Sequence, residues 1–553
     1  MPASGSRSSS IGAPPASEAP LEQLVRALHD PRCYPHPVDR VQVIETHISV
    51  VLLAGAFAYK LKKPLDLGFL DFTTLELRRQ CCEDELRLNR RSAPQIYLGV
   101  VAITGTLDAP RIGGEAPVIE YAVLMGAFEQ DDLLDRRLSE GKAGADEIDE
   151  IAQVVADFHQ RIDRAGAGSE FGSPASVWKP VRENFQTLRR LVDGAEERHM
   201  LAVLARWSRG RHRQLAPWFL RRQAEGFVRE CHGDLHLGNI ARISSAICLF
   251  DCLEFNPSLR WIDVANEIAF TVMDLADRGR ADLGWRLLDT WLMHTGDHDA
   301  LPGLSCYLVY RALVRAKVSA LRAAQPDVDR EQRRRLDQQR HTYLTLASTC
   351  AAARPMIAIT HGVSGSGKSY GSMQLLMRIG AVRVRSDVER KRLFGLAPGE
   401  RSRSGLGEAI YDQQATARTY AKLETAVRAA IAGGLPVIVD ATFLQRAARD
   451  RFRALAESLN VPFVILAFSA PERELRVRVV ARERSGDDPS DSGLEVLQHQ
   501  LAQSHWLDED EYALAIVIDA RGSAAAASLD RAVAALSERL HSTLALQAAT
   551  EPG

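Results

Sequence analysis

The chain has 553 residues, more than one hydrophobic core usually supports, so two or more domains are expected. Its hydrophobic content of 46% and charged content of 25% are those of ordinary soluble globular proteins. The 69 Lys and Arg residues are balanced by 71 Asp and Glu residues, which excludes a general electrostatic attraction to nucleic acid or to an anionic membrane.

The cysteines, the apolar segments and the N-terminus together indicate a cytoplasmic protein. The eight cysteines include the adjacent pair Cys81 and Cys82 but no CxxC pair, so neither a disulfide framework nor a zinc site is expected. The longest apolar run, Ile48 to Tyr59, is too short to span a bilayer. Residues 1–20 are rich in Ser, Pro, Ala and Gly without an apolar signal core, and they are expected to form a disordered tail.

The first predicted elements after the tail are two apolar segments, VQVIETHISVVLLAG and AFAYKLKK, which meet at Ala54 and Gly55. Their junction favours a hairpin and an antiparallel lobe over a helical crossover. From about Asp131 to Ala324 helix-like segments dominate, interrupted by a short strand-like pair around CHGDLHLGNI and AICLFDCLEF.

Within that pair, the turn HGDLHLGN places Asp234 five residues before Asn239. Asp251 follows at the end of the apolar strand ICLF. Kinase chemistry needs such a set, because one group orients or deprotonates the acceptor hydroxyl while the others bind Mg²⁺. The spacing therefore predicts a phosphotransfer site.

The HGDxHxxN string and the downstream aspartate resemble the aminoglycoside phosphotransferase branch of the protein-kinase-like fold, which includes choline and homoserine kinases. The continuation CLEFNPSLRWIDVANEIAF is similar to a subgroup of uncharacterised bacterial proteins in which this domain precedes a P-loop domain. The resemblance implies that Asp234 is the catalytic base, that Asn239 and Asp251 bind Mg²⁺, and that Asp263 is a structural aspartate supporting the catalytic loop.

The same resemblance implies ATP-binding residues upstream. Lys60 in AFAYKLKKP would contact the α and β phosphates, and Glu85 is the preferred partner to orient it, with Glu83 and Glu76 as alternatives. The segment IEYAVLMGAF would be the hinge whose backbone binds adenine. Met125 in that segment either lines the adenine pocket or is an ordinary core methionine.

Two features depart from other kinases or allow another interpretation. No GxGxxG motif is present, and THIS at Thr46 to Ser49 occupies the expected position of the phosphate-covering loop. His232 and His236 have an HxxxH spacing on a predicted loop without a third metal ligand, so a structural role is expected for both.

The stretch DVDREQRRRLDQQRHTYLTLASTCAAA is expected to form a charged helix that either packs on the first domain or links the two domains. We place the domain boundary near residue 350. The predicted organisation is a tail over 1–20, a kinase-like domain over 21–350 and a P-loop kinase domain over 355–545. The N-lobe of the first domain covers about 36–128 and the C-lobe about 129–350.

From Pro355 onward, five short apolar runs alternate with helix-like stretches, a pattern typical of parallel strands buried on both faces. The runs are PMIAITHG, VRVRSD, PVIVDAT, PFVILAFSA and AIVIDA. The predicted fold class is therefore α/β and α+β in two domains, with a protein-kinase-like two-lobed fold followed by a P-loop NTPase parallel-sheet kinase domain.

The first of these runs leads directly into GVSGSGKS, a match to GxxxxGK[ST] that precedes a helical stretch. Its glycines let backbone N–H groups surround phosphate oxygens, while Lys368 can reach the β and γ phosphates and the Ser369 hydroxyl can ligate Mg²⁺. The predicted nucleotide-binding residues are Gly362, Val363, Ser364, Gly365, Ser366, Gly367, Lys368, Ser369 and Tyr370.

Charged residues follow the later strands of this domain. Asp387, after the second strand, is a candidate base for an acceptor hydroxyl, with a helix N-cap as the alternative. Asp440, at the end of PVIVDATF, is suited to holding a Mg²⁺ shell through water. Arg478 and Arg482 lie on one face of a predicted helix, where they form either a lid over the transferring phosphate or a solvated basic face.

These motifs resemble small P-loop kinases of the polynucleotide 5′-kinase, gluconate kinase and zeta-toxin type. The resemblance implies γ-phosphate transfer to a hydroxyl, with Asp387 as base, Arg390 near the acceptor, and Arg478 and Arg482 in the lid. The expected function is an ATP- and Mg²⁺-dependent phosphotransferase with two sites. In the alternative, the N-terminal module is a regulatory nucleotide-binding domain. The acceptor is expected to be a small molecule, a nucleotide or a polynucleotide, and no membrane partner is expected.

Overall fold

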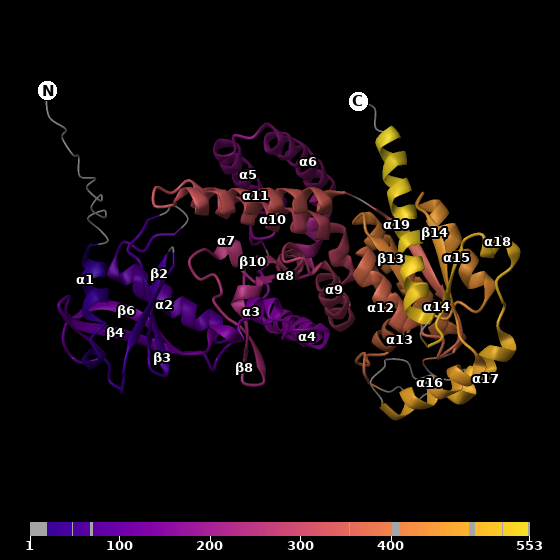
Figure 1. Ribbon diagram of the computed structural model, residues 1–553, viewed down its shortest axis with the longest axis horizontal. Helices are drawn as coiled ribbons and strands as arrows, with labels where there is room; N and C mark the ends of the chain where they lie inside the picture. Colours follow the sequence, from indigo (N-terminus) through magenta and orange to yellow (C-terminus); the bar gives the residue numbers. More distant parts are fainter. Residues whose placement is uncertain are drawn as a thin grey trace, which may run out of the picture. The chain divides into compact units, whose positions relative to one another are not determined.

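The computed structural model describes residues 19–46, 48–66, 70–166, 168–352, 354–400, 410, 412–485, 493–522 and 524–550 (Figure 1). The chain forms two compact units, one of residues 1–142 with 230–261 and one of residues 143–229 with 262–553. The HGDLHLGN turn belongs to the first unit and the P-loop to the second. The domain limits expected from the sequence stay predictions, because compactness divides the chain at other positions.

A six-stranded sheet in the order β1-β2-β3-β6-β4-β5 is the framework of the first unit. Its neighbouring strands pair antiparallel. In chain order the strands are β1 (Val41–Glu45), β2 (Ser49–Ala54), β3 (Phe57–Lys62), β4 (Tyr97–Thr106), β5 (Ala109–Ile112) and β6 (Val118–Gly126).

The expected hairpin at Ala54 and Gly55 joins β2 to β3, and Gly55 has a φ of 62°, which a residue without a Cβ adopts readily. The segment VQVIETHISVVLLAG also contains the preceding strand β1, which the sequence analysis did not separate from β2. The Thr46 hydroxyl oxygen accepts from the N–H of Ser49 at 3.0 Å and turns the chain between β1 and β2. His47, in the predicted phosphate-covering loop, lies outside the described residues.

Two helices cover the faces of this sheet, and strand alternation decides which side chains meet each of them. On one face lies α1 (Ala19–Ala27). Its Leu24, and Leu28 directly after its end, pack with Leu52, Tyr59 and other residues of the sheet. On the other face α2 (Leu75–Asn89) contributes Cys82 to a core with Ala58 and residues of β4 and β6. Ala58, Lys60 and Lys62 are alternate residues of β3, so their side chains lie on the same face of the sheet. The two lysines therefore point toward α2.

The rest of the first unit consists of short elements. They are η1 (Pro31–Cys33), η2 (Gln130–Asp132), α3 (Leu134–Ser139), η3 (Leu237–Asn239), the antiparallel pair β8 (Ile240–Ile243) and β9 (Ala246–Leu249), and α7 (Pro257–Arg260). The strands β7 (Val228–Glu230) and β10 (Trp261–Asp263) lie at the chain positions where one unit passes into the other. The strand-like pair expected around the HGD turn is therefore β8 and β9, and the HGD turn itself precedes them.

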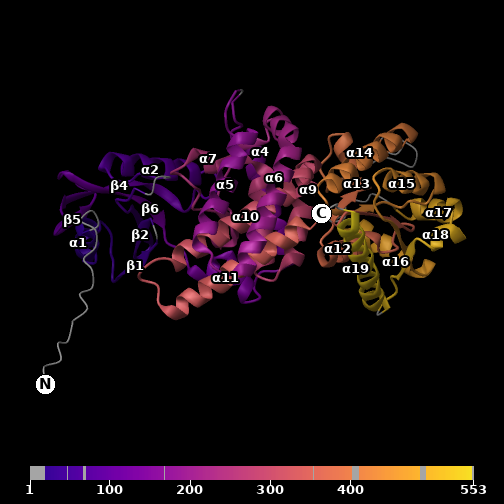
Figure 2. The ribbon, with the colours of Figure 1, turned by 90° about the horizontal axis from the view of Figure 1, so that it is seen from above.

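The first part of the second unit is helical. Its elements are α4 (Ala145–Arg161), α5 (Pro174–Leu191), α6 (Ala195–Ala224), α8 (Val264–Asp277), α9 (Ala281–Thr295), η4 (His298–Ala300), α10 (Leu301–Ala323) and α11 (Arg330–Ala351). The expected charged helix is α11, which begins after Asp329, whose carboxylate accepts from the N–H of Gln332 at 2.8 Å. It packs on α10 and α6, and its course beside α10 is visible in Figure 2.

The P-loop part of the second unit contains all five predicted strands in one parallel sheet, in the order β12-β13-β11-β14-β15. They are β11 (Met356–His361), β12 (Val382–Arg385), β13 (Pro436–Asp440), β14 (Phe463–Ser469) and β15 (Ala515–Asp519). The strand that leads into the P-loop is central, so the carboxyl ends of its neighbours β13 and β14 flank the phosphate loop. The predicted fold class is confirmed.

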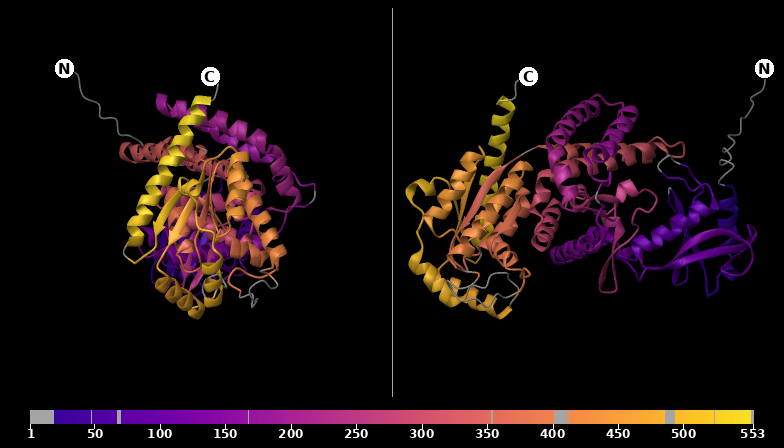
Figure 3. Two further views of the ribbon diagram at one scale, coloured as in Figure 1. Left: turned by 90° about the vertical axis from the view of Figure 1, so that its right-hand side faces the viewer. Right: turned by 180° about the vertical axis from the view of Figure 1, so that it is seen from behind.

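Helices cover both faces of this sheet. On one face, α12 (Lys368–Ile379) and α19 (Ala524–Thr550) bury Leu375 and Leu536 against Ala358 and Leu466; α19 is seen beside the sheet in Figure 3. The other helices are α13 (Ser386–Leu393), α14 (Gln413–Ala432), α15 (Arg446–Ser458), α16 (Glu472–Ser485), α17 (Leu494–Gln503) and α18 (Glu509–Tyr512). Among the described residues no helix has both the length and the apolar character needed to cross a membrane.

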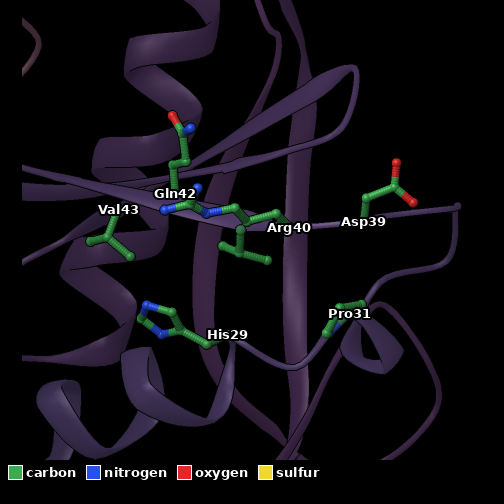
Figure 4. A pocket seen from close by; sticks show the side chains of 7 residues that line it. His29, Pro31, Asp39, Arg40, Gln42 and Val43 are labelled. Carbon is green, nitrogen blue, oxygen red and sulfur yellow. The ribbon is translucent and has the colours of Figure 1, made fainter.

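An open pocket of about 670 Å³ lies where the end of α1 meets β1. Figure 4 shows the side chains around it, which come from His29, Pro31 and the segment Asp39 to Val43. Since β1 is the edge strand of the sheet and Lys60 lies on β3, this pocket is separate from the predicted kinase site.

Two candidate nucleotide sites

The candidates for the kinase-like site meet on the α2 face of the first sheet. Lys60 of β3 places its Nζ 2.8 Å from Oε1 of Glu85 on α2 and 2.5 Å from Oδ1 of Asp251. The two alternative partners, Glu76 and Glu83, both pair with an exposed arginine of α2 instead. Of the three glutamates considered, the structure therefore pairs Lys60 with Glu85.

Lys62 and Glu254 also belong to this cluster, and the sequence analysis missed both. The Lys62 side chain is fully buried and forms ion pairs with Glu85 and with Glu254. The cluster is thus a ladder of alternating charge that runs from Asp251 through Lys60, Glu85 and Lys62 to Glu254. The available signal was the i, i+2 spacing of the two lysines, which puts both on one face of a strand.

These contacts set the charge states of the cluster. Burial alone would lower the pKa of Lys60, but the charges of Asp251 and Glu85 outweigh it and hold this pKa well above its usual value. Burial would likewise raise the pKa of Asp251, but the charge and hydrogen bond of Lys60 lower it to about 2. Both side chains are therefore charged at neutral pH, and the Asp251 side chain is still 45% exposed.

Hydrogen bonds fasten the HGDLHLGN turn to the strand that carries Asp251. The Nε2 of His232 donates to the carbonyl oxygen of Phe250 at 2.7 Å, and the Phe250 N–H donates to the carbonyl of Asn239 at 3.0 Å. Within the turn, Nδ2 of Asn239 donates to the carbonyl of Asp234 at 2.9 Å. The structure thereby brings Asp234, Asn239 and Asp251 into one local assembly.

The backbone conformation of the turn and of Asp251 restricts which residues can occupy these positions. Gly233 has a φ of 87°, and a Cβ there would lie 2.9 Å from the carbonyl oxygen of Leu259. Asp251 has a φ of 63°, unusual for a residue with a side chain, and its N–H donates to the Tyr97 hydroxyl at 3.1 Å. His236 accepts from a backbone N–H of the turn at 3.1 Å, so both histidines bind backbone groups, as expected of structural residues.

Met125 lies near the end of β6, within the predicted hinge segment. Its side chain is buried in the core cluster with Ala58, Tyr97 and Cys248, so the structure favours the core-methionine interpretation. Contact of Met125 with adenine stays a prediction. Asp263, predicted to support the catalytic loop, caps α8 and pairs with buried Arg222.

The predicted phosphate loop joins β11 to α12. Gly362, Gly365 and Gly367 have φ values of 145°, 80° and 89°, and a Cβ on Gly362 or Gly365 would come within 2.7 or 2.8 Å of a backbone oxygen. The Nζ of Lys368 donates to the carbonyl of Val363 at 2.8 Å, inside the turn. The loop is therefore folded as the motif predicts.

The two predicted Mg²⁺ ligands of this domain lie close together. The hydroxyl of Ser372, one turn into α12, is 3.2 Å from Oδ2 of Asp440 and 3.2 Å from the carbonyl of Ser369. The guanidinium of Arg385 lies 3.5 Å from Oγ of Ser369 and 3.7 Å from Oδ2 of Asp440. Hydroxyl and carboxylate oxygens are ligands that Mg²⁺ prefers, so these residues fit the ion chemically.

Asp387 is the second residue of α13, whose N-cap is Arg385, so the alternative role of Asp387 as a helix N-cap is wrong. Its role as a base stays a prediction. Arg390, expected near the acceptor, is buried and donates to the carbonyl of Ile410 at 2.9 Å and to the hydroxyl of Thr416 at 3.1 Å. Both bonds lie around the start of α14.

The predicted lid helix is α16, and it packs directly on the phosphate loop. Val363 of the loop shares an apolar cluster with Leu475 and Val479. The Nη1 of Arg478 lies 3.4 Å from the carbonyl of Gly365, while Arg482 follows one turn later on the same helix. Contact of either arginine with a transferring phosphate stays a prediction.

A pocket of about 410 Å³ opens beside the phosphate loop. The exposed ring of Tyr370 and the guanidinium of Arg478 contribute to a lining of otherwise small or apolar residues, a combination suited to a planar base. Of its lining, Gly367, Tyr370 and Arg478 were singled out from the sequence. The other residues were missed, since they come from segments far apart in the chain: Gly371, Phe468, Ile518, Ala520, Gly522, Ala525, Ala526 and Leu529.

Comparison with known proteins agrees with this organisation. Residues 357–505 match the family described as an AAA domain. An uncharacterised protein of Mycobacterium tuberculosis is 31% identical over 83% of this chain and 90% of its own length, and a protein of Mycobacterium bovis gives the same values. This chain belongs to their family. In this chain a kinase-like region precedes the C-terminal P-loop domain.

Solved structures similar to parts of this chain were also found. An amicoumacin kinase in complex with AMP-PNP is 12% identical, with a TM-score of 0.39, over 60% of this chain and 94% of its own. An ethanolamine kinase of Plasmodium vivax is 11% identical, with a TM-score of 0.34, over 57% and 83%. A gluconokinase of Sinorhizobium meliloti is 22% identical, with a TM-score of 0.26, over 35% and 99%.

The contact between Asp251 and Lys60 should make stability depend on pH. The pKa of Asp251 is about 2 in the folded chain against an ordinary value of 3.8, so the folded state holds the carboxylate more readily as an anion. The stabilisation is therefore complete above about pH 4 and is lost as the pH falls toward 2. We expect the urea midpoint of Asp251→Asn to fall less over this range than that of the wild type. Equal slopes would contradict the pairing, and Asp84→Asn, at an exposed carboxylate of α2, is the control.

Proposed function

We propose that this chain is an ATP-dependent phosphotransferase with two Mg-ATP sites, each of which transfers a γ-phosphate to a hydroxyl acceptor. The observation that carries the proposal is the contact of Lys60 with both Glu85 and Asp251, next to a turn that presents Asp234 and Asn239. A protein that only bound nucleotide would need no base at Asp234. The folded phosphate loop around Lys368 supports the second site.

In the first site each chemical role in phosphotransfer has candidate side chains. Lys60 would bind the α and β phosphates, held in place by Glu85, and Asp234 would take the proton of the acceptor hydroxyl. Because Nδ2 of Asn239 donates to the Asp234 carbonyl, the amide Oδ1 is the atom that can bind a cation together with Asp251. Mg²⁺ would supply charge neutralisation on the phosphates. Binding of Mg-ATP would move Lys60 from Asp251 to the phosphates.

In the second site the backbone amides of the phosphate loop and Lys368 would bind the β and γ phosphates. Ser369 and Asp440 would hold Mg²⁺, and the pocket beside Tyr370 would take the base. Asp387 would accept the proton of the acceptor, and Arg478 and Arg482 would stabilise charge on the transferring group. We propose a small molecule, nucleotide or polynucleotide as acceptor and the cytoplasm as location.

A comparison of phosphorylated metabolites tests this function. The full-length protein is incubated with ATP, Mg²⁺ and a cell extract, beside the variants Asp234→Asn, Lys368→Ala and the double variant. We expect some products to disappear with Asp234→Asn and others with Lys368→Ala, because each variant disables one site. Products that depend on Lys368 alone would favour a regulatory role for the first site. The absence of any ATP-dependent product from the wild type would contradict the proposal.

A further inference from the structure

Arg383 of β12 is a buried cation beside the proposed metal site of the P-loop domain. It forms a two-pronged ion pair with Asp289 of α9, with Nε 3.2 Å from Oδ1 and Nη2 2.6 Å from Oδ2. The side chains of Arg383 and Asp289 are only 3% and 6% exposed. The pair joins α9 of the helical region to the P-loop sheet within the second unit.

The remaining nitrogen of Arg383 faces the proposed metal ligands. Its Nη1 donates to the carbonyl of Ser369 at 3.0 Å and lies 3.4 Å from the hydroxyl of Ser372. The same Nη1 is 3.9 Å from Oδ2 of Asp440, too far for a hydrogen bond. Arg383 therefore supports the backbone of the metal-binding serine while its charge stays at the edge of the carboxylate that would face the ion.

Without Asp289 the balance of charge at this site would change. A buried guanidinium needs a carboxylate partner, and Oδ2 of Asp440 lies only 3.9 Å from Nη1. Arg385 already lies 3.7 Å from Asp440, so a second guanidinium would add further positive charge where Mg²⁺ should bind. The uncompensated charge would repel the ion, and direct pairing would occupy its ligand.

We propose that Asp289 is a positioning residue of the P-loop metal site: it holds Arg383 away from Asp440 and neutralises its charge, so that Ser369 and Asp440 can take Mg²⁺. This inference rests on the proposed function of the P-loop domain. It makes α9, which precedes that domain in the chain by about 60 residues, a part of its active site.

Other contacts hold α9 and α10 in the place that this role requires. Arg392 of α13 donates to the carbonyl of Met293 at 2.6 Å, near the end of α9, and Ser305 of α10 donates to the carbonyl of Gly433 at 2.9 Å. α9 also packs along α12, as Figure 1 shows. The position of Asp289 is therefore fixed from several sides.

The test measures how nucleotide binding to the full-length protein depends on Mg²⁺, in an Asp251→Asn background that removes a metal ligand of the first site. Binding of a non-hydrolysable ATP analogue is followed by calorimetry over a range of Mg²⁺ concentrations. We expect Asp289→Asn to raise the Mg²⁺ concentration for half-maximal binding about 10- to 100-fold, as loss of an outer-shell partner of a metal ligand does. Binding in EDTA should change little.

Two further variants separate positioning from a merely structural role. Adding Arg383→Gln to Asp289→Asn removes the competing charge and should recover most of the Mg²⁺ response. Ser305→Ala loses one hydrogen bond to the P-loop domain and has no link to Ser369. Because Arg392 and the packing on α12 still hold α9, this control should leave the response unchanged. If Asp289→Asn does not fold, Asp289→Glu, which keeps the charge, should show a Mg²⁺ response close to that of the background.

The outcomes distinguish this inference from the proposed function. The role of Asp289 would be overturned if Asp289→Asn left the Mg²⁺ response unchanged. It would also be overturned if Asp289→Glu lost much of the response and adding Arg383→Gln did not restore it. In both cases nucleotide binding by the P-loop domain would still stand. If the background itself binds no nucleotide that Lys368→Ala removes, the proposed function of this domain fails and the inference fails with it.

Discussion

Asp234→Asn should lower the turnover of the first site about 100- to 10,000-fold, the range for loss of a general base, while ATP binds nearly as before. The carboxylate is presented by a turn fixed at Gly233 and Asn239, and Lys60 with Glu85 would hold the phosphates independently of it. The measurement is kcat and KM for ATP in a Lys368→Ala background, with an acceptor found in the metabolite comparison.

The matched control for Asp234 is Asp84→Asn, at an exposed carboxylate of α2 in the same unit. It should leave both constants unchanged. A loss of ATP affinity as large as the loss of kcat in Asp234→Asn would contradict the role of Asp234 as a base, because a group that acts only on the acceptor contributes little to ATP binding.

Lys62→Met should destabilise the first unit by about 3–5 kcal/mol, the usual cost of removing one partner of a buried ion pair. Two buried carboxylates, Glu85 and Glu254, would lose a partner at once. Hydrogen exchange of the full-length protein, followed in peptides from β3 and α2, measures the loss because it reports the opening free energy of each segment separately.

The neighbouring Lys63 offers the control for Lys62. Lys63 pairs with Glu45, whose side chain is 68% exposed, so Lys63→Met should cost at most about 1 kcal/mol. The double variant Lys62→Met with Glu254→Gln should recover part of the loss, since one of the unpaired charges is gone. Equal protection in the variants at Lys62 and Lys63 would show that the buried charge ladder does not stabilise the unit.

The parts of the fold that the sequence predicted are those whose signals are local. Five β-rich apolar runs became five parallel strands because each carries its own burial pattern, and GVSGSGKS formed the phosphate loop because its glycines alone allow that backbone. The lysine of the kinase-like site and its glutamate could be placed on a strand and a helix. Spacing could not choose Glu85 over Glu83, because that depends on which turn of α2 faces β3.

The parts that could not be predicted depend on contacts between distant segments. Lys62 meets Glu254 across 192 positions of the chain, and Arg383 meets Asp289 across 94. The i, i+2 spacing with Lys60 gives the face on which Lys62 lies but not its partner, and no local pattern marks the pair of Arg383 and Asp289. The division of VQVIETHISVVLLAG into β1 and β2 was missed for another reason: its apolar pattern continues through the turn that Thr46 and Ser49 make.

The most direct test of the central claim is the number of nucleotides that the full-length protein binds. Calorimetry with a non-hydrolysable ATP analogue and Mg²⁺ should find two per chain for the wild type and one for Lys368→Ala. The combination of Lys368→Ala with Asp251→Asn should bind much less at the remaining site. A wild-type chain that binds one nucleotide or none would contradict the account.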